Sequence, residues 1–313
     1  MWRSLQAQGG REDQWWALCL DDSSYHCLRE LELPGVHVLS LEEVEAATPG
    51  LRGCRTDRSL VEYYFTLSPI LPLYVMDHHP EVELVTYLDA DLFFYAPPEP
   101  LYAEFGQSSV GMIEHRFAPG RQDHERYGVF NVGWVTFRND ALAREVLHWW
   151  RTQCMEHCKD AAENGKFADQ KYLDDWPRRF PGVKVLSHFG ANVAPWNLAT
   201  HRLAWDERSQ SVLVDGQPLL FYHFHDMQVH CGRFWELPGR YWVRHSSRIL
   251  KKRIYDPYVV AWRRQQDALP PTFQARRAAA AAERSNNALR RGGFWRQVSR
   301  LTRLALQGRL IWR

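Results

Sequence analysis

Short apolar runs alternate with longer amphipathic segments through most of this 313-residue chain, and that order restricts the possible folds more than any other property of the sequence. Short runs rich in β-branched and aromatic residues are typical of strands, and apolar residues every three or four positions are typical of helices. Where the two alternate, the sequence predicts an α/β sheet, mainly parallel, with helices on both faces. The expected strands are residues 15–20, 36–39, 83–88, 109–113, 133–137, 183–186 and 218–224, and the expected helices are residues 23–31, 59–79, 99–105, 140–159 and 168–179.

Charge divides the chain into two unequal parts. Residues 244–313 hold 17 Lys/Arg and 3 Asp/Glu, a net charge of +14, whereas residues 1–243 hold 22 Lys/Arg and 34 Asp/Glu, a net charge of −12. Because 45% of all residues are hydrophobic, the composition excludes a disordered polar chain. We therefore expect an α/β domain over residues 1–243 and a basic, mostly helical extension over residues 244–313.

The sequence shows neither a secretory signal nor an apolar stretch of about 20 residues that would cross a membrane, so we expect a cytoplasmic protein. The six cysteines show no regular spacing, which argues against a disulfide framework. Cys154, His157 and Cys158 fall on one face of an expected helix and could hold a metal. Packing of the two thiols along an amphipathic helix is the favoured alternative.

Two acidic residues follow the expected strand over residues 83–88. Asp89 and Asp91 are two positions apart, and side chains at that spacing point to the same side of an extended backbone. Two carboxylates aimed at one point repel each other unless a cation lies between them. The carboxyl end of a strand is also where open α/β sheets bind ligands. We expect a metal site here, with a solvated turn as the alternative.

Two histidines end a later apolar run in the same way. His223 and His225 alternate along the expected strand over residues 218–224. A lone buried histidine is usually only hydrogen-bonded, but two at a strand end, in a chain with a carboxylate pair, suggest a shared site. Mn²⁺ accepts an imidazole beside carboxylates, whereas Mg²⁺ prefers oxygen alone. Such a cation could neutralise a diphosphate leaving group.

These motifs together resemble those of GT-A nucleotide-sugar glycosyltransferases, in particular glycosyltransferase family 8 and its bacterial relatives. Their order and spacing agree over about residues 1–230. The resemblance implies a Rossmann-like α/β domain that transfers a sugar, as hexosyltransferases do, with retention of anomeric configuration. The motifs are Leu88-Asp-Ala-Asp, Phe130-Asn-Val-Gly-Trp, Phe167-Ala-Asp-Gln-Lys-Tyr-Leu and His223-Phe-His.

The resemblance also implies roles for single residues. Asp89, Asp91 and His223, with His225 as the alternative, would hold Mn²⁺ (or Mg²⁺) on the diphosphate of a nucleotide-sugar donor. Further residues would line the sugar: Asn131 and Gly133 in the donor pocket, and Asp169 and Gln170 beside the transferred sugar. By its position alone, Asp169 at the start of an expected helix would be a helix cap or an acidic residue of the first turn.

The sequence departs from the family pattern in two places. The segment that contacts phosphate in family 8 is absent after His223, so either another cation such as Arg233 takes that role or the role is not filled. Relatives begin with a strand before a helix that reads much like Met1-Trp-Arg-Ser-Leu. We therefore expect the first strand of the sheet to be missing and the adjacent strand edge to be unpaired.

The basic extension has two interpretations. Apolar residues at spacings of three or four alternate with arginines over residues 290–313, a pattern typical of a helix lying on an anionic membrane surface. The same stripe would also suit a helix packed on the catalytic domain. Nucleic acid is not an expected partner, because no recognition motif appears.

Three functions compete at this stage. The leading one is metal-dependent transfer of a sugar from a nucleotide diphosphate to a glycan, lipid-linked or protein acceptor. The second is a non-catalytic nucleotide-sugar or glycan-binding protein of the same fold. The third, a nucleotidyltransferase, would normally show a glycine-rich phosphate loop near the N-terminus, and the sequence has none.

Overall fold

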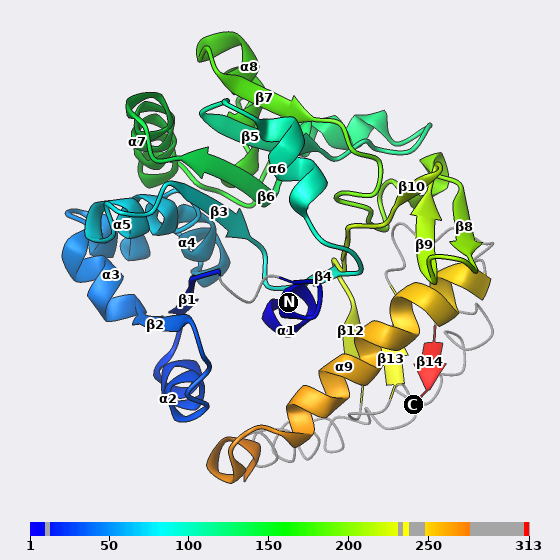
Figure 1. Cartoon of the computed structure of the whole chain (residues 1–313). Coiled ribbons are helices and arrows are strands. Elements are labelled where there is room, and N and C mark those ends of the chain that lie inside the picture. Colours follow the sequence, from blue (N-terminus) through cyan, green and yellow to red (C-terminus); the bar gives the residue numbers. More distant parts are fainter. Residues whose placement is uncertain (10–12, 231–233, 238–247, 276–309, 313) are drawn as a thin grey trace, which may run out of the picture. The chain divides into compact units, whose positions relative to one another are not determined.

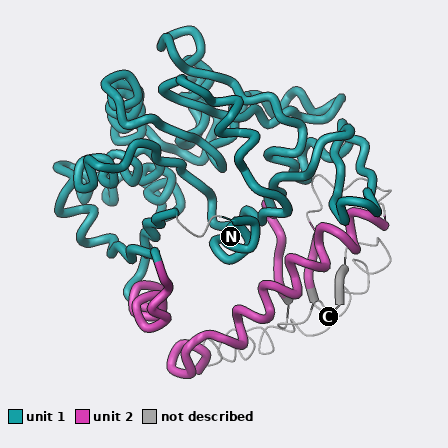
Figure 2. Tube along the Cα trace, in the orientation of Figure 1, with its two compact units in different colours: residues 1–22, 35–223 teal, residues 23–34, 224–313 magenta. Residues whose placement is uncertain are grey.

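The computed structural model describes most of the chain in two compact units (Figure 1, Figure 2). Unit 1 comprises residues 1–22 and 35–223, and unit 2 comprises residues 23–34 and 224–313. The domain boundary expected at residue 243 lies outside the described residues and stays a prediction. The described residues are 1–9, 13–230, 234–237, 248–275 and 310–312.

The largest sheet of unit 1 has the strand order β3–β6–β5–β7. β6 (Phe130–Arg138) lies between β3 (Leu84–Leu88) and β5 (Val110–Glu114) and runs antiparallel to both. β7 (Val183–Leu186) pairs in parallel with β5. The α/β class is thus confirmed, but this sheet is mixed rather than mainly parallel. Parallel neighbours need a crossover connection, and only the short 3-10 helix η2 (Gln122–Tyr127) lies between β5 and β6, so the chain turns back beside itself.

Helices cover both faces of this sheet, as the sequence predicted. On one face, Val135 of β6 belongs to an apolar cluster with α5 (Ile70–His78) and α7 (Ala141–Glu156). On the other face, Trp134 belongs to a cluster with α6 (Glu99–Phe105). Neighbouring residues of a strand point to opposite faces, so one strand contributes to both clusters. Because β6 is bonded on both edges and covered on both faces, its sequence is almost continuously apolar.

A second, parallel pair of strands joins β1 (Trp15–Cys19) to β2 (Val36–Ser40). Ser40 begins the helix that follows, since its side chain accepts a hydrogen bond from the Glu43 amide. A reciprocal capping box between Ser59 and Glu62 begins the helix over Leu60–Thr66. The capping box satisfies amide groups that would otherwise have no partner. The elements concerned are α3 (Leu41–Ala47), η1 (Leu51–Thr56) and α4 (Leu60–Thr66).

The N-terminal residues Trp2–Gln6 form the short helix α1, and the described residues before position 10 contain no strand. The expected missing strand stays a prediction. The expected helix over residues 168–179 is instead a 3-10 helix followed by one α-helical turn. The expected strand over residues 218–224 is present as the shorter strand β11 (Phe221–His223), which follows β10 (Gln217–Pro218). Three other short strands, β4 (Leu92–Phe94), β8 (Leu203–Asp206) and β9 (Ser211–Val214), escaped prediction because three or four residues are too few for a clear periodicity. The helical elements of this region are η3 (Gln170–Asp175), α8 (Trp176–Arg179) and η4 (Leu198–Thr200).

Unit 2 contains a helical segment and a small antiparallel sheet. Within it, Phe224 stacks on Tyr258 with ring centroids 3.7 Å apart. Residues 290–309 and 313, to which membrane binding was assigned, lie outside the described residues, and that assignment stays a prediction. The described helices include none that is long and apolar enough to cross a bilayer. The elements are α2 (Asp22–Glu30, which begins in unit 1), β12 (Gln228–His230), β13 (Phe234–Glu236), the π-helix η5 (Leu250–Tyr255), α9 (Asp256–Asp267) and β14 (Leu310–Trp312).

Candidate functional site

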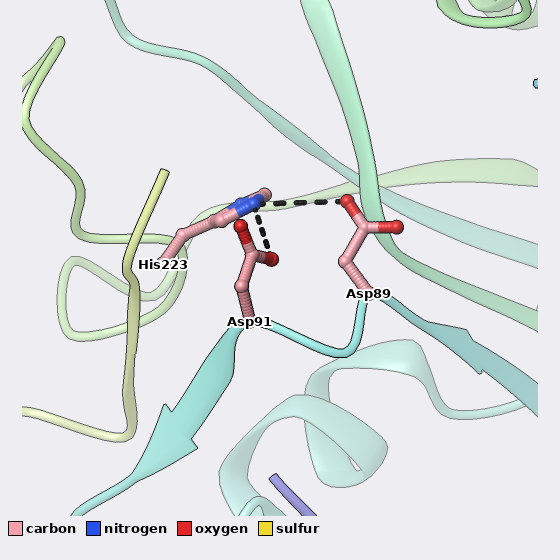
Figure 3. A group of neighbouring side chains, drawn as sticks. All are labelled: Asp89, Asp91 and His223. Atoms are coloured by element: carbon pink, nitrogen blue, oxygen red, sulfur yellow. Dashed lines mark ion pairs between the residues drawn. The ribbon is translucent and has the colours of Figure 1, made fainter. Parts of the chain in front are cut away.

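Asp89 and Asp91 flank the tight turn that joins β3 to β4. The Asp89 amide donates to the Gly133 carbonyl over 3.2 Å, and the Leu92 amide donates to the Asp89 carbonyl over 3.3 Å. The first of these bonds ties the turn to β6, and the second closes the turn itself. Both carboxylates point toward His223 (Figure 3), as the spacing of two residues predicted.

His223 reaches this turn because β4 and β11 pair antiparallel, with Leu92 opposite His223. Its Nε2 atom lies 3.0 Å from Asp91 Oδ1 and 3.7 Å from Asp89 Oδ2 (Figure 3). Each of the three side chains offers a ligand atom, and these atoms all lie within 4.8 Å of one another. A cation that binds its ligands at about 2.0–2.6 Å can contact all of them.

The three side chains differ in exposure. The His223 imidazole is only 4% exposed, whereas the Asp89 and Asp91 side chains are 32% and 42% exposed. The imidazole is thus held rigidly in the interior, and the carboxylates face solvent. A charged ligand can therefore approach this group from the carboxylate side.

The charges of the group influence one another. Burial by itself would lower the pKa of His223, but the carboxylates of Asp91 and Asp89 outweigh burial and raise it. Burial, opposed by His223 and reinforced by the charge of Asp91, raises the pKa of Asp89. A cation between the two carboxylates would remove their repulsion. Two carboxylates and one imidazole are a donor set that suits Mn²⁺, so the residues present fit a divalent metal.

Asn131 and Gly133 of β6 lie directly beside His223. The Asn131 side-chain oxygen accepts a hydrogen bond from the Gly133 amide over 3.1 Å. A Cβ atom at position 133 would come within 2.6 Å of Asn131 Oδ1 and 2.8 Å of His223 Cε1. Only glycine fits between these two side chains, which explains the Asn-x-Gly pattern by close approach.

His115 belongs to the same surroundings, although the sequence did not single it out. Its Nε2 atom lies 3.2 Å from the Asn131 side-chain nitrogen, so this ring nitrogen accepts and Nδ1 carries the proton. The His115 carbonyl accepts from the indole of Trp196, whose ring meets that of His223 edge-on at 5.1 Å. The only sequence signal for His115 was its place two residues after an expected strand.

Asp169 and Gln170 differ in their surroundings. Asp169 is 6% exposed and takes the N-cap position of η3 without a side-chain capping bond, so the helix-cap interpretation holds for its position only. Its carboxylate accepts a hydrogen bond from the Ser68 hydroxyl over 2.5 Å. Burial raises the pKa of Asp169 to about 7, against the effect of the Ser68 bond, and the charge of Asp89 contributes to the increase. The Gln170 amide group instead donates to the Tyr127 carbonyl.

Three other expectations concern His225, Arg233 and the cysteine pair. His225 is exposed and belongs to unit 2, and the candidate metal group found among the described residues contains His223 and not His225. Arg233 lies outside the described residues. Cys154 and Cys158 are completely buried in the apolar cluster of α5 and α7, and that metal group includes neither. The interpretation of these thiols as core residues is thus the one that their burial supports.

Comparison with known proteins places this α/β chain among relatives of similar length. It is 31% identical over 261 residues to the uncharacterized protein YfnD of Bacillus subtilis (strain 168), with 82% of each chain covered. It is 32% identical over 236 residues to the uncharacterized protein YfnF of the same strain, covering 73% of this chain and 77% of that protein. The chain belongs to the family of YfnD and YfnF. No family model matches it.

Solved structures with similarity to the chain include three glycosyltransferases. The first takes part in glycosylation of the major capsid of PBCV-1, with a TM-score of 0.39, 13% identity and coverage of 69% of this chain and 94% of that one. Mouse xyloside xylosyltransferase 1 has a TM-score of 0.41 and 15% identity, covering 71% of this chain and 93% of that one. The bifunctional glycosyltransferase WbbM has a TM-score of 0.42 and 13% identity, covering 72% of this chain and 42% of that one. At these values the likeness does not decide what this chain does.

Proposed function

We propose that unit 1 is a metal-dependent glycosyltransferase of the GT-A fold, which moves a sugar from a nucleotide-diphosphate donor to a glycan, lipid-linked or protein acceptor. The observation that carries the proposal is the convergence of Asp89, Asp91 and His223 at the carboxyl end of β3. That end of a strand is where ligands bind in α/β sheets. The motif resemblance, which includes the same three residues, supports it.

Glycosyl transfer requires two opposite charges to be stabilised. As the bond between the anomeric carbon and the diphosphate breaks, positive charge develops on the sugar ring and negative charge on the leaving group. Mn²⁺ bound by Asp89, Asp91 and His223 would neutralise the diphosphate. The half-exposed carboxylates leave room for a substrate oxygen to complete the ligand set.

The remaining residues would position the sugar. We assign Asn131 and Gly133 to the donor pocket, because Gly133 packs directly against His223 and the Asn131 amide is held by two hydrogen bonds. We place Asp169 on the sugar side, where an ionised carboxylate would stabilise the positive ring, with Gln170 next to it. Transfer with retention is part of the proposal and rests on the motif resemblance.

A panel of nucleotide-diphosphate sugars tests the proposal, with the full chain and Mn²⁺. We expect one donor to raise Tm by several degrees and to be hydrolysed slowly in the absence of an acceptor. Asp91→Asn should lose both effects, whereas Asp206→Asn, which changes a half-buried carboxylate at the end of β8, should retain them. If no donor raises Tm, the proposal fails. A donor that binds and never turns over would favour the nucleotide-sugar-binding protein.

A further inference from the structure

Residues 132–134 of β6 form a bulge beside the candidate metal group. The register between β5 and β6 shifts after Met112, and the pairing skips these three residues. Bulges are common next to functional sites, where they re-aim the strand. This one sets Gly133 against His223, and the Gly133 carbonyl accepts a hydrogen bond from the Asp89 amide over 3.2 Å. The bulge therefore contacts two of the three metal-binding candidates.

The side chain of Asn131 holds this bulge. Its oxygen accepts a hydrogen bond from the Gly133 amide over 3.1 Å, which satisfies a backbone donor in the irregular part of the strand. Because the Gly133 N–H group can only donate, the oxygen of the Asn131 amide has to face it and the NH₂ group has to face away. If the amide turned over, this bond would be lost.

His115 receives the NH₂ group of Asn131. The Asn131 nitrogen donates to His115 Nε2 over 3.2 Å, so the proton of the neutral ring is on Nδ1. His115 Nδ1 lies 3.3 Å from the Val129 carbonyl, which accepts from it. The series that runs from this ring to the amide of Asp89 thus has one proton and one acceptor for every hydrogen bond.

His115 is itself fixed by its surroundings. It is 5% exposed, its amide donates to the Val129 carbonyl over 2.8 Å, and its ring stacks on Phe117 with centroids 4.7 Å apart. Its carbonyl accepts from the Trp196 indole over 3.0 Å, and the Trp196 ring meets His223 edge-on at 5.1 Å. Through its ring and its carbonyl, His115 thus holds two of the groups that pack on the His223 imidazole.

We propose that His115 is a positioning residue of the metal site. Its Nε2 atom sets the Asn131 amide, the amide holds the bulge, and the bulge keeps His223 and the Asp89 turn in place. Residues that orient metal ligands from behind typically change metal affinity by roughly 10- to 100-fold when they are removed. The effect on turnover rests on the proposed function, whereas the effect on Mn²⁺ affinity requires only the metal group.

Three variants separate the Nε2 acceptor from the bulk of the ring. His115→Phe keeps an aromatic ring beside Phe117 and Trp196 but removes both ring nitrogens. His115→Gln loses the ring but can offer an amide oxygen where Nε2 accepts. His201→Phe is the matched control, because the His201 side chain is 4% exposed and its Nδ1 atom lies 2.7 Å from Asp215 Oδ2. The control also removes a buried, hydrogen-bonded imidazole.

Mn²⁺ affinity of the full chain is the first measurement, made by electron paramagnetic resonance. We expect His115→Phe to weaken Mn²⁺ binding about 10-fold, because the Asn131 amide loses its acceptor. His115→Gln should bind within about threefold of the unmodified protein, and His201→Phe should bind as the unmodified protein does. If the ring mattered only for packing, His115→Gln would be the more damaging of the two His115 variants.

The tautomer of His115 is the second measurement. ¹⁵N NMR of the metal-free protein should show a proton on Nδ1 and none on Nε2, with the signals assigned by their loss in His115→Gln. A ring with a proton on Nε2 cannot accept from the Asn131 amide, so that result would overturn the inference at any Mn²⁺ affinity. This measurement decides even if His115→Phe does not fold.

These readouts separate the inference from the proposed function. If the unmodified protein transfers sugar and His115→Phe binds Mn²⁺ as His201→Phe does, the positioning role is wrong and the function stands. If the unmodified protein binds Mn²⁺ but transfers nothing, the function fails, and the Mn²⁺ affinities and the tautomer decide the role of His115. If it binds no Mn²⁺, the inference is overturned, and the donor panel decides separately whether sugar is transferred.

Discussion

Two groups of side chains in unit 1 have residue types that bind metals, and their environments are opposite. Asp89, Asp91 and His223 converge at a strand end with both carboxylates about one-third or more exposed. Cys154 and Cys158, near the end of α7, have no exposed surface. Burial raises the pKa of the Cys154 thiol, and the hydrogen bond with Cys158 adds to the increase.

The difference shows that residue type alone does not make a metal site. A cysteine binds a metal as the ionised thiolate, and a thiol whose pKa is raised stays protonated. The strand-end group keeps its carboxylate oxygens near solvent, whereas the helix-end group removes its sulfur atoms from water and packs them as small apolar groups. Four predictions test this contrast, from the largest expected effect to the smallest.

The strand-end group should lose its metal when one carboxylate is removed. Asp91→Asn should weaken Mn²⁺ binding more than about 100-fold, because the neutral amide is a poor ligand and one negative charge is lost. Isothermal titration with Mn²⁺ measures the affinity, and Asp206→Asn is the control. Affinity within a factor of three of the unmodified protein would remove the basis for the contrast.

Asp169 is electrostatically coupled to both groups, since the charge of Asp89 contributes to the raised pKa of Asp169 and the charge of Asp169 contributes to the raised pKa of Cys154. Its pKa is raised to about 7 in the folded state, so between about pH 4 and pH 7 the folded chain holds a proton that the unfolded chain has lost. This contribution therefore lowers stability as pH rises, by at most about 1.4 kcal/mol per pH unit.

Asp169→Asn should remove that pH dependence. The unfolding free energy of the variant minus that of the unmodified protein should therefore increase from pH 5 to pH 7.5. Urea unfolding without metal measures both. The control is Asp206→Asn: hydrogen bonds from Ser209 and from the Arg208 amide lower the pKa of the Asp206 carboxyl, so its removal should not produce such a gain. A difference between variant and unmodified protein that does not change with pH would contradict the prediction.

Gly133 tests how closely the strand-end group is packed. Gly133→Ala places a Cβ atom 2.6 Å from Asn131 Oδ1 and 2.8 Å from His223 Cε1, so one of these side chains has to move. We expect a loss of about 1–3 kcal/mol in unfolding free energy together with weaker Mn²⁺ binding. Gly53→Ala, at a position with open space around the new atom, is the control. Normal Mn²⁺ affinity in Gly133→Ala would show that His223 does not set the site geometry.

The thiol pair should give the smallest effect, and on stability alone. Cys158→Ala removes one buried heavy atom, so we expect a loss of about 0.5–1.5 kcal/mol in unfolding free energy and no change in Mn²⁺ affinity. Urea unfolding and metal titration on the same samples measure both. If Zn²⁺ raises the Tm of the unmodified protein and this increase disappears in Cys158→Ala, the thiols bind metal and the contrast is wrong.

Local patterns predicted a large part of this molecule. The strand before Asp89, the helix over α7 and the place of His223 at a strand end follow from periodicity and from residue type. The orientation of β6 did not follow, because pairing direction depends on the connection before it and not on the strand's own residues. Short strands such as β4 were missed for lack of length, although β4 is the strand that brings His223 to the two aspartates.

The sequence by itself determined an α/β chain with two carboxylates and an imidazole at strand ends. The fold class and the strand ends can be predicted because both depend on neighbours along the chain. Only the tertiary structure decided which groups meet. Ser68 contacts Asp169, 101 residues away in the sequence. Gly133, which has no side chain, lies against His223. Such pairings arise from the packing of elements that are distant along the chain. A hydroxyl or a glycine has no local signature of the partner that it will contact.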